Sequence, residues 1–194
     1  MSESDAADHG VIRFFTDIWP LLALGLIGAL LIRACLPAHP LPAATGPAPP
    51  FDPKTAVRVG NFHAMAALGA LTAQSATSQV LEALNLVVID FKAGSSTLPD
   101  DAEPVLMQVG GALAARPADE RYEISGHTDA TDSPLADLEL SRRRAQAVID
   151  FLVNQGVASQ RLRARGAGDA EPVSSEPDEE SRFRNRRLEF ALLP

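Results

Sequence analysis

The sequence predicts an α/β sandwich in which helices pack on one face of a mixed sheet, with the element order β-α-β-α-β-β. Short apolar runs rich in β-branched residues alternate with longer stretches of helical periodicity over residues 85–194. A second observation adds one N-terminal transmembrane helix, because residues 18–36 carry a single charge. A third is a proline-rich segment between these two parts. The chain therefore divides into an anchor, a linker and a folded domain.

The N-terminal part is predicted to be a membrane anchor. Residues 1–17 form a short acidic tail, and residues 18–36, at about 1.5 Å per residue, are long enough to cross a bilayer core. Trp19 and Arg33 stand near the two ends, where interfacial and snorkelling side chains belong. A cleaved signal peptide is disfavoured, since it has a basic start and a shorter apolar stretch. A lipid anchor on Cys35 is disfavoured because Arg33 replaces a small residue.

The next two segments are predicted to be a linker and a helical region. Seven of the 17 residues in 37–53 are proline, so the linker, residues 37–54, extends as polyproline II. Such a semi-stiff tether reaches on the order of 50 Å. Residues 55–84 are alanine-rich, and their apolar spacing predicts one or two amphipathic helices, without indicating what these helices pack against.

The folded domain, residues 85–194, is predicted from periodicity and from helix-end signals. Ser133 and Pro134 are a typical helix start, and Gly156 is a typical left-handed end. Residues 169–181 are interpreted as a solvated acidic loop. The expected elements are strand 86–91, helix 100–115, strand 122–126, helix 134–155, strand 161–165 and strand 187–192.

Composition excludes several classes of function. The formal net charge of −8 argues against a nucleic-acid partner, since such proteins normally carry a basic surplus. One cysteine and four scattered histidines provide neither a disulfide nor the spacing of a metal site. We therefore expect no metal, no cofactor and no nucleic acid.

One arginine lies on the wrong face of its helix. On a helical wheel of 134–155, Arg144 falls in the apolar arc beside Leu140, Val148 and Phe151. A guanidinium directed at a core needs a partner, and its planar fork suits a carboxylate. The partner is either an internal acid, which makes a structural ion pair, or the carboxylate of a ligand.

A second cluster of polar residues, Gly126 to Asp129, follows a predicted strand, where binding loops are common. Asp129 can pair with Arg144 or accept hydrogen bonds from a ligand ammonium. His127 and Ser125 face the same side, but no oxyanion or orienting motif accompanies them. We expect no catalytic residues and no enzyme.

Four ordered blocks then carry a family resemblance. They are Gly126-His127-Thr128-Asp129, Leu140-Ser141-x-x-Arg144-Ala145-x-x-Val148, Gly166-x-Gly168-Asp169-x-x-Pro172 and Asn185-Arg186-Arg187-Leu188-Glu189. Over residues 85–194 the chain resembles the OmpA-like peptidoglycan-binding domain, the family that includes Pal and MotB.

The resemblance implies a noncovalent binding site for the diaminopimelate of the peptidoglycan peptide stem. It assigns the carboxylate of the ligand to Arg144 and its ammonium to Asp129. Asp137 departs from the family, which often has asparagine there, and Lys92 departs from its usual acidic or amide residue. The ligand-binding residues carried over are Asp129, Arg144, Thr128, Asp137, Leu140 and Phe91.

Together these features predict a single-pass protein that is held in inner-membrane lipid and binds peptidoglycan from the periplasm, tethering the envelope or a membrane complex to the wall. The charge bias around residues 18–36 does not by itself support this orientation. A stator-like or secretion-system accessory subunit with the same layout is the alternative. A stator needs an acid within the membrane, and Asp17 only borders the span. A wall-cleaving enzyme is disfavoured, since Asp129 and Asp137 are the only tempting carboxylate pair.

Overall fold

The computed structural model describes residues 50–130 and 133–194. The predicted tail 1–17, the predicted transmembrane helix 18–36 and most of the linker 37–54 lie outside the described residues. Across 50–130 and 133–194, none of the helices combines the length and apolarity that a bilayer crossing requires.

The centre of the domain is a mixed sheet of three strands, in the order β2-β1-β3. Strand β1 runs parallel to β2 and antiparallel to β3, so that Ile124 lies opposite Ala164 on one side and Phe190 on the other. The predicted mixed character of the sheet is confirmed. The strands are β1 (Arg121–His127), β2 (Leu162–Gly168) and β3 (Leu188–Leu193).

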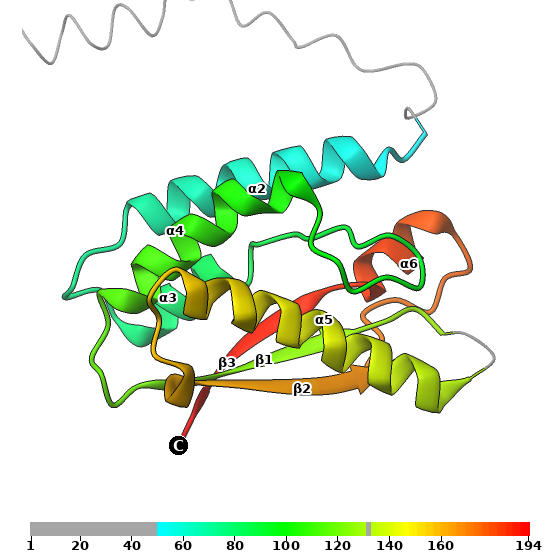
Figure 1. Ribbon diagram of the computed structural model, residues 1–194. Helices are drawn as coiled ribbons and strands as arrows, with labels where there is room; N and C mark the ends of the chain where they lie inside the picture. Colours follow the sequence, from blue (N-terminus) through cyan, green and yellow to red (C-terminus); the bar gives the residue numbers. More distant parts are fainter. Residues whose placement is uncertain (1–49, 131–132) are drawn as a thin grey trace, which may run out of the picture. The chain divides into compact units, whose positions relative to one another are not determined.

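Five α-helices accompany this sheet in the described residues (Figure 1). Helices α4 and α5 lie where periodicity predicts them, and α5 begins after Ser133 with Pro134 in its first turn. It ends before Gly156, whose φ of 95° is the left-handed conformation expected there. The helices are α2 (Pro53–Gly69), α3 (Thr77–Leu84), α4 (Glu103–Ala114), α5 (Pro134–Asn154) and α6 (Glu179–Asn185).

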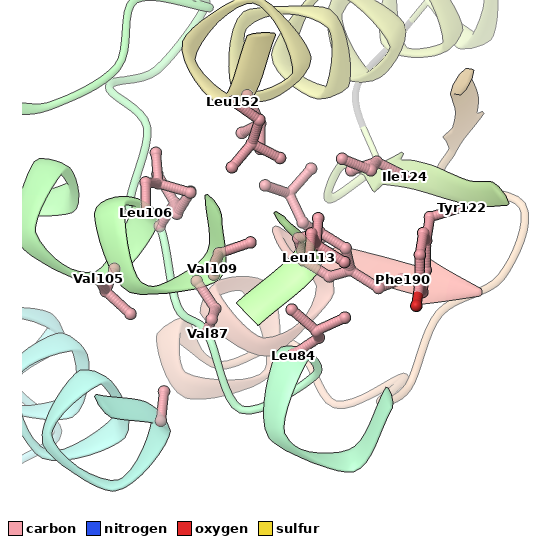
Figure 2. Packing of buried hydrophobic residues seen from close by; sticks show 14 of the residues in the cluster. Leu84, Val87, Val105, Leu106, Val109, Leu113, Tyr122, Ile124, Leu152 and Phe190 are labelled. Carbon is pink, nitrogen blue, oxygen red and sulfur yellow. The ribbon is translucent and has the colours of Figure 1, made fainter. Parts of the chain in front are cut away.

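The hydrophobic core lies between one face of the sheet and the helices. Leu106 of α4, Leu152 of α5 and Phe190 of β3 converge there, as Figure 2 shows. Leu84 of α3 belongs to the same cluster, and Leu68 of α2 joins it beside α4. The helices in the predicted segment 55–84 therefore pack on the domain itself and bury their apolar faces in its core.

The predicted strand 86–91 is wrong. Its alternation of buried side chains is present, but two asparagine amides occupy backbone groups that a strand ladder would use. Asn61 donates to the Val88 carbonyl at 2.9 Å and accepts from the Val88 amide at 2.9 Å. Asn85 makes the equivalent pair with Phe190 at 3.0 and 2.7 Å. The segment is therefore extended and buried but lies outside the sheet.

The interpretation of 169–181 as a loop throughout is wrong at its end. The Asp178 carboxylate accepts from the Ser181 amide at 2.7 Å and caps the start of α6. The Asn185 side chain at the other end holds the amides of Val173 and Ser174. These contacts stabilise α6, which lies between β2 and β3 in the order of the chain.

Glycines allow α5 to lie directly on β1 and β2. A Cβ at Gly126 would stand 2.1 Å from the Ser141 carbonyl oxygen, and one at Gly166 would stand 2.3 Å from the Leu138 carbonyl oxygen. The Ser141 hydroxyl also accepts from the Gly168 amide at 3.0 Å. This close approach fixes α5 against the ends of the strands, and with it the position of Arg144.

Candidate functional site

A pocket of about 410 Å³ lies at the end of β1. Its walls are the extended segment 90–94, the residues just after β1, the first half of α5, and α6 with the residue that follows it. All six binding residues expected from the sequence line it: Phe91, Thr128, Asp129, Asp137, Leu140 and Arg144. Four segments far apart in the chain thus meet at one hollow.

Arg144 is the central side chain of this pocket. It is only 3% exposed, as its place on the apolar arc of α5 predicts. Its Nε donates to the Ser95 carbonyl at 2.9 Å and its Nη2 to the Lys92 carbonyl at 3.1 Å. The guanidinium carbon lies 5.1 Å from the centroid of the Phe91 ring. Backbone oxygens and an aromatic face therefore orient the group.

No acid in the described part of the chain forms an ion pair with Arg144. Burial lowers the pKa of its guanidinium, and the attraction of Asp129 opposes that shift without closing a salt bridge. The Nη1 atom receives no acceptor from the described residues. A buried positive charge is therefore oriented toward a hollow without an ion-paired acid in the part of the chain that the structure describes.

Asp129 is paired with a different arginine. Its Oδ2 lies 3.3 Å from Nη1 of Arg186, whose Nη2 lies 2.8 Å from Glu179. Arg186 also lines the pocket, and its positive charge contributes to the lowered pKa of Arg144. In the sequence Arg186 stands out only as part of the block Asn185-Arg186-Arg187-Leu188-Glu189, and it was not predicted as a pocket residue. No local pattern distinguishes it, because its role depends on where α6 ends.

The other expected residues complete the walls. Thr128 is 4% exposed, and its hydroxyl is buried without a hydrogen-bond partner among the described residues. Asp137 is buried and Leu140 half-buried, both on the α5 side. Lys92 lines the opposite side. The pocket thus presents cations and acids together, which suits a ligand that carries both a carboxylate and an ammonium.

His127 lies outside this pocket. Its side chain is 1% exposed, and its Nε2 stands 3.6 Å from a carboxylate oxygen of Glu189. Burial lowers the pKa of the imidazole, and the nearby Arg187 lowers it further. Burial therefore favours the neutral imidazole, and both ring nitrogens are buried without a hydrogen-bond partner among the described residues. Among the described residues, no group of three histidine, cysteine or acidic side chains could hold a metal ion.

Known proteins share this architecture. ArfA of Mycobacterium tuberculosis, a peptidoglycan-binding protein, is 39% identical over 99 residues, which cover 51% of this chain and 30% of ArfA. The probable lipoprotein YiaD of Escherichia coli is 33% identical over 106 residues, 55% of this chain and 48% of YiaD. The chain therefore spans less than half the length of these relatives.

A solved structure extends the comparison to the fold. The peptidoglycan-associated lipoprotein of Burkholderia pseudomallei superposes with a TM-score of 0.51 and 28% identity, over 54% of this chain and 88% of that one. The model of the OmpA family matches residues 90–186, which include every expected binding residue. Since this match covers half of its length, the chain belongs to the OmpA family.

Proposed function

We propose that the domain binds peptidoglycan noncovalently through the diaminopimelate of the peptide stem. One observation carries the proposal: the guanidinium of Arg144 is buried, oriented by two carbonyls and open to a pocket, yet it has no acid of its own among the described residues. A ligand carboxylate supplies the missing counter-charge. ArfA, which is named for peptidoglycan binding, supports the ligand class.

The chain is not an enzyme, since the peptidoglycan-binding proteins of the OmpA family are non-enzymatic. The prediction that the chain is not an enzyme is therefore confirmed by its family.

The distal carbon of diaminopimelate carries both a carboxylate and an ammonium, and each of these groups has a counterpart in the pocket. Its carboxylate faces Arg144, and its ammonium faces Asp129, which is 28% exposed and therefore accessible. Asp129 already contacts Arg186 at 3.3 Å, so the ammonium must compete with that guanidinium. Glu179, at 2.8 Å from Arg186, keeps Arg186 compensated when Asp129 turns to the ligand.

The proposal extends to the cellular arrangement. Residues 18–36 hold the chain in the inner membrane, residues 37–54 span part of the periplasm, and the domain tethers the envelope or a membrane complex to the wall. A reporter that is active only in the periplasm, fused after Pro194, tests the orientation. Activity of that reporter is expected, and its absence would contradict the arrangement.

Sedimentation with isolated sacculi tests the binding site. Detergent-solubilised full-length protein is compared with Arg144→Ala and Asp129→Ala, each of which should lose at least about tenfold in affinity. Arg143→Ala is the matched control, because this neighbouring arginine is half-exposed and pairs only with Glu139 at 3.4 Å. Thermal unfolding of each variant shows whether the domain remains folded.

A second comparison tests the diamino acid itself. Sacculi in which lysine replaces diaminopimelate lack the second carboxylate and should bind weakly to the wild-type protein. If both alanine variants bind like the wild type, the site is wrong. If lysine-containing sacculi bind equally well, the wall remains the ligand but diaminopimelate does not.

A further inference from the structure

A second hollow, of about 570 Å³, adjoins the pocket. Glu123 and Ser125 of β1 line it, and these residues alternate with Tyr122 and Ile124, which face the core. The hollow therefore opens on the sheet face opposite α5. Among the described residues, Arg186 is the one that lines both hollows, so its side chain stands between them.

The second hollow carries a surplus of positive charge in a chain whose net charge is −8. Four arginines and two glutamates line it. Most of these charges are already paired: Glu189 contacts Arg187 at 2.6 Å, and Glu123 contacts Arg163, outside the hollow, at 3.6 Å. Arg165 contacts Glu171 at 2.7 Å and Arg186 contacts Glu179 at 2.8 Å, which leaves Arg184 as the arginine of the hollow without an acid among the described residues. Charge complementarity therefore favours an anionic ligand.

Two guanidinium groups there are incompletely satisfied. Arg184 is exposed and has no ion-pair or hydrogen-bond partner in the part of the chain that the structure describes. Arg187 is 20% exposed, and its buried Nη1 lacks an acceptor among the same residues. Both flank the start of β3, and both line the hollow. A carboxylate at this place would give the exposed Arg184 the partner that it lacks.

The backbone of β3 adds a site for a peptide. β3 is an edge strand, and Asn85 occupies the outward amide and carbonyl of Phe190. Leu188 lies two residues away, so its amide and carbonyl face the same open edge. In the described residues these two groups have no partner. They can pair with one residue of an extended peptide, as in strand addition.

We propose that this second hollow binds the part of the same peptidoglycan stem that adjoins the diaminopimelate. A stem carboxylate would lie between Arg184 and Arg187, and the stem backbone would pair with Leu188. This inference rests on the proposed function, because the diaminopimelate residue must first occupy the pocket of Arg144. It extends the ligand from one residue to a peptide.

Isothermal titration of two ligands separates the two hollows. Free diaminopimelate fills only the pocket, whereas the tetrapeptide L-Ala-D-Glu-diaminopimelate-D-Ala reaches both. The full-length wild type should bind the tetrapeptide more tightly. Arg184→Gln should lower tetrapeptide affinity about fivefold and leave that of diaminopimelate unchanged, because Arg184 does not line the pocket. Arg143→Gln is the control, since Arg143 is 51% exposed, pairs with Glu139, and neither residue lines either hollow.

The outcomes are distinguishable. Unchanged tetrapeptide affinity in Arg184→Gln, or an equal loss for both ligands, overturns the second subsite while the pocket stands. An equal loss in Arg143→Gln also overturns it, because the effect is then general electrostatics. If the wild type binds neither ligand, the proposed function fails first and the extension fails with it.

Discussion

Two buried arginines lie near opposite ends of β1 and are satisfied in opposite ways. Arg116 makes two contacts with the Glu120 carboxylate, at 2.6 and 2.9 Å, and also donates to the carbonyl of Ser75 and the hydroxyl of Thr77. Arg144 has only two backbone carbonyls and no acid in the described residues. The first cation is neutralised by its own chain, whereas the second has no ion-paired acid among the described residues.

A third arginine shows which property matters. Arg161 is also buried and also donates to two carbonyls, those of Glu120 and Leu113, with Tyr122 beneath it. It lines neither of the two hollows described above. The lack of an acidic partner is therefore not sufficient to mark a binding group. What distinguishes Arg144 is that it also opens into a pocket.

The largest expected effect is a loss of stability, without a loss of binding, when the Arg116–Glu120 ion pair is broken. Glu120→Gln leaves Arg116, which is 8% exposed, without its counter-charge and should lower the free energy of unfolding by about 3 kcal/mol. Sacculus binding should persist wherever the variant is folded. Urea unfolding measures the first effect, and sedimentation with sacculi measures the second.

The control for this variant is Glu139→Gln. Glu139 is 70% exposed and pairs with Arg143 on the surface of α5, so its loss should change stability by less than about 0.5 kcal/mol. If Glu120→Gln and Glu139→Gln lowered the free energy of unfolding equally, the Arg116–Glu120 pair would contribute no more than a surface pair.

The Arg116–Glu120 ion pair also predicts that the domain loses stability in acid. Hydrogen bonds from Arg116 lower the pKa of Glu120 from its ordinary value of 4.5 to about 2. The unfolded chain therefore binds more protons between these two values, and this part of the stability is present above pH 4.5 and lost as the pH falls toward 2. Urea midpoints measured across this range should fall more steeply for the wild type than for Glu120→Gln. Parallel curves would contradict the assignment.

A smaller effect is expected where α5 lies on the sheet. Gly126→Ala would place a methyl group 2.1 Å from the Ser141 carbonyl oxygen, so α5 must move away from β1, at a cost of about 1–3 kcal/mol. This shift also moves Arg144, so sacculus affinity should fall together with stability. Gly111→Ala on α4 is the matched control, since nothing lies within 4 Å of its added Cβ. Loss of stability in that control would show that the effect is not steric.

The sequence predicted the burial of Arg144 correctly, because one helix face decides whether a side chain is buried, whereas its role in binding stays a prediction. Most of the other expected pocket residues lie outside the helix of Arg144. In the sequence, only the four ordered blocks indicated that they belong to one site. The missed features depend on distant contacts. Asn61 reaches Val88 across 27 positions, and no local pattern shows that an amide will replace a strand partner. Helix α6 is seven residues long, too short for periodicity to distinguish from a loop.

The smallest predicted effect concerns the competition for Asp129. Glu179 accepts from Arg186 at 2.8 Å and so draws that guanidinium away from Asp129. Glu179→Gln should let Arg186 bind Asp129 more tightly, and the affinity for free diaminopimelate should fall about twofold, because the pair is exposed to solvent.

Glu180→Gln removes the same charge from the neighbouring position of α6, and Glu180 has no ion pair among the described residues. It should therefore bind diaminopimelate like the wild type. A larger loss in Glu180→Gln than in Glu179→Gln would mean that the net charge of α6, and not the position of Arg186, sets the affinity. Tighter binding in Glu179→Gln would mean that Arg186 contacts the ligand carboxylate directly, as a second cation beside Arg144.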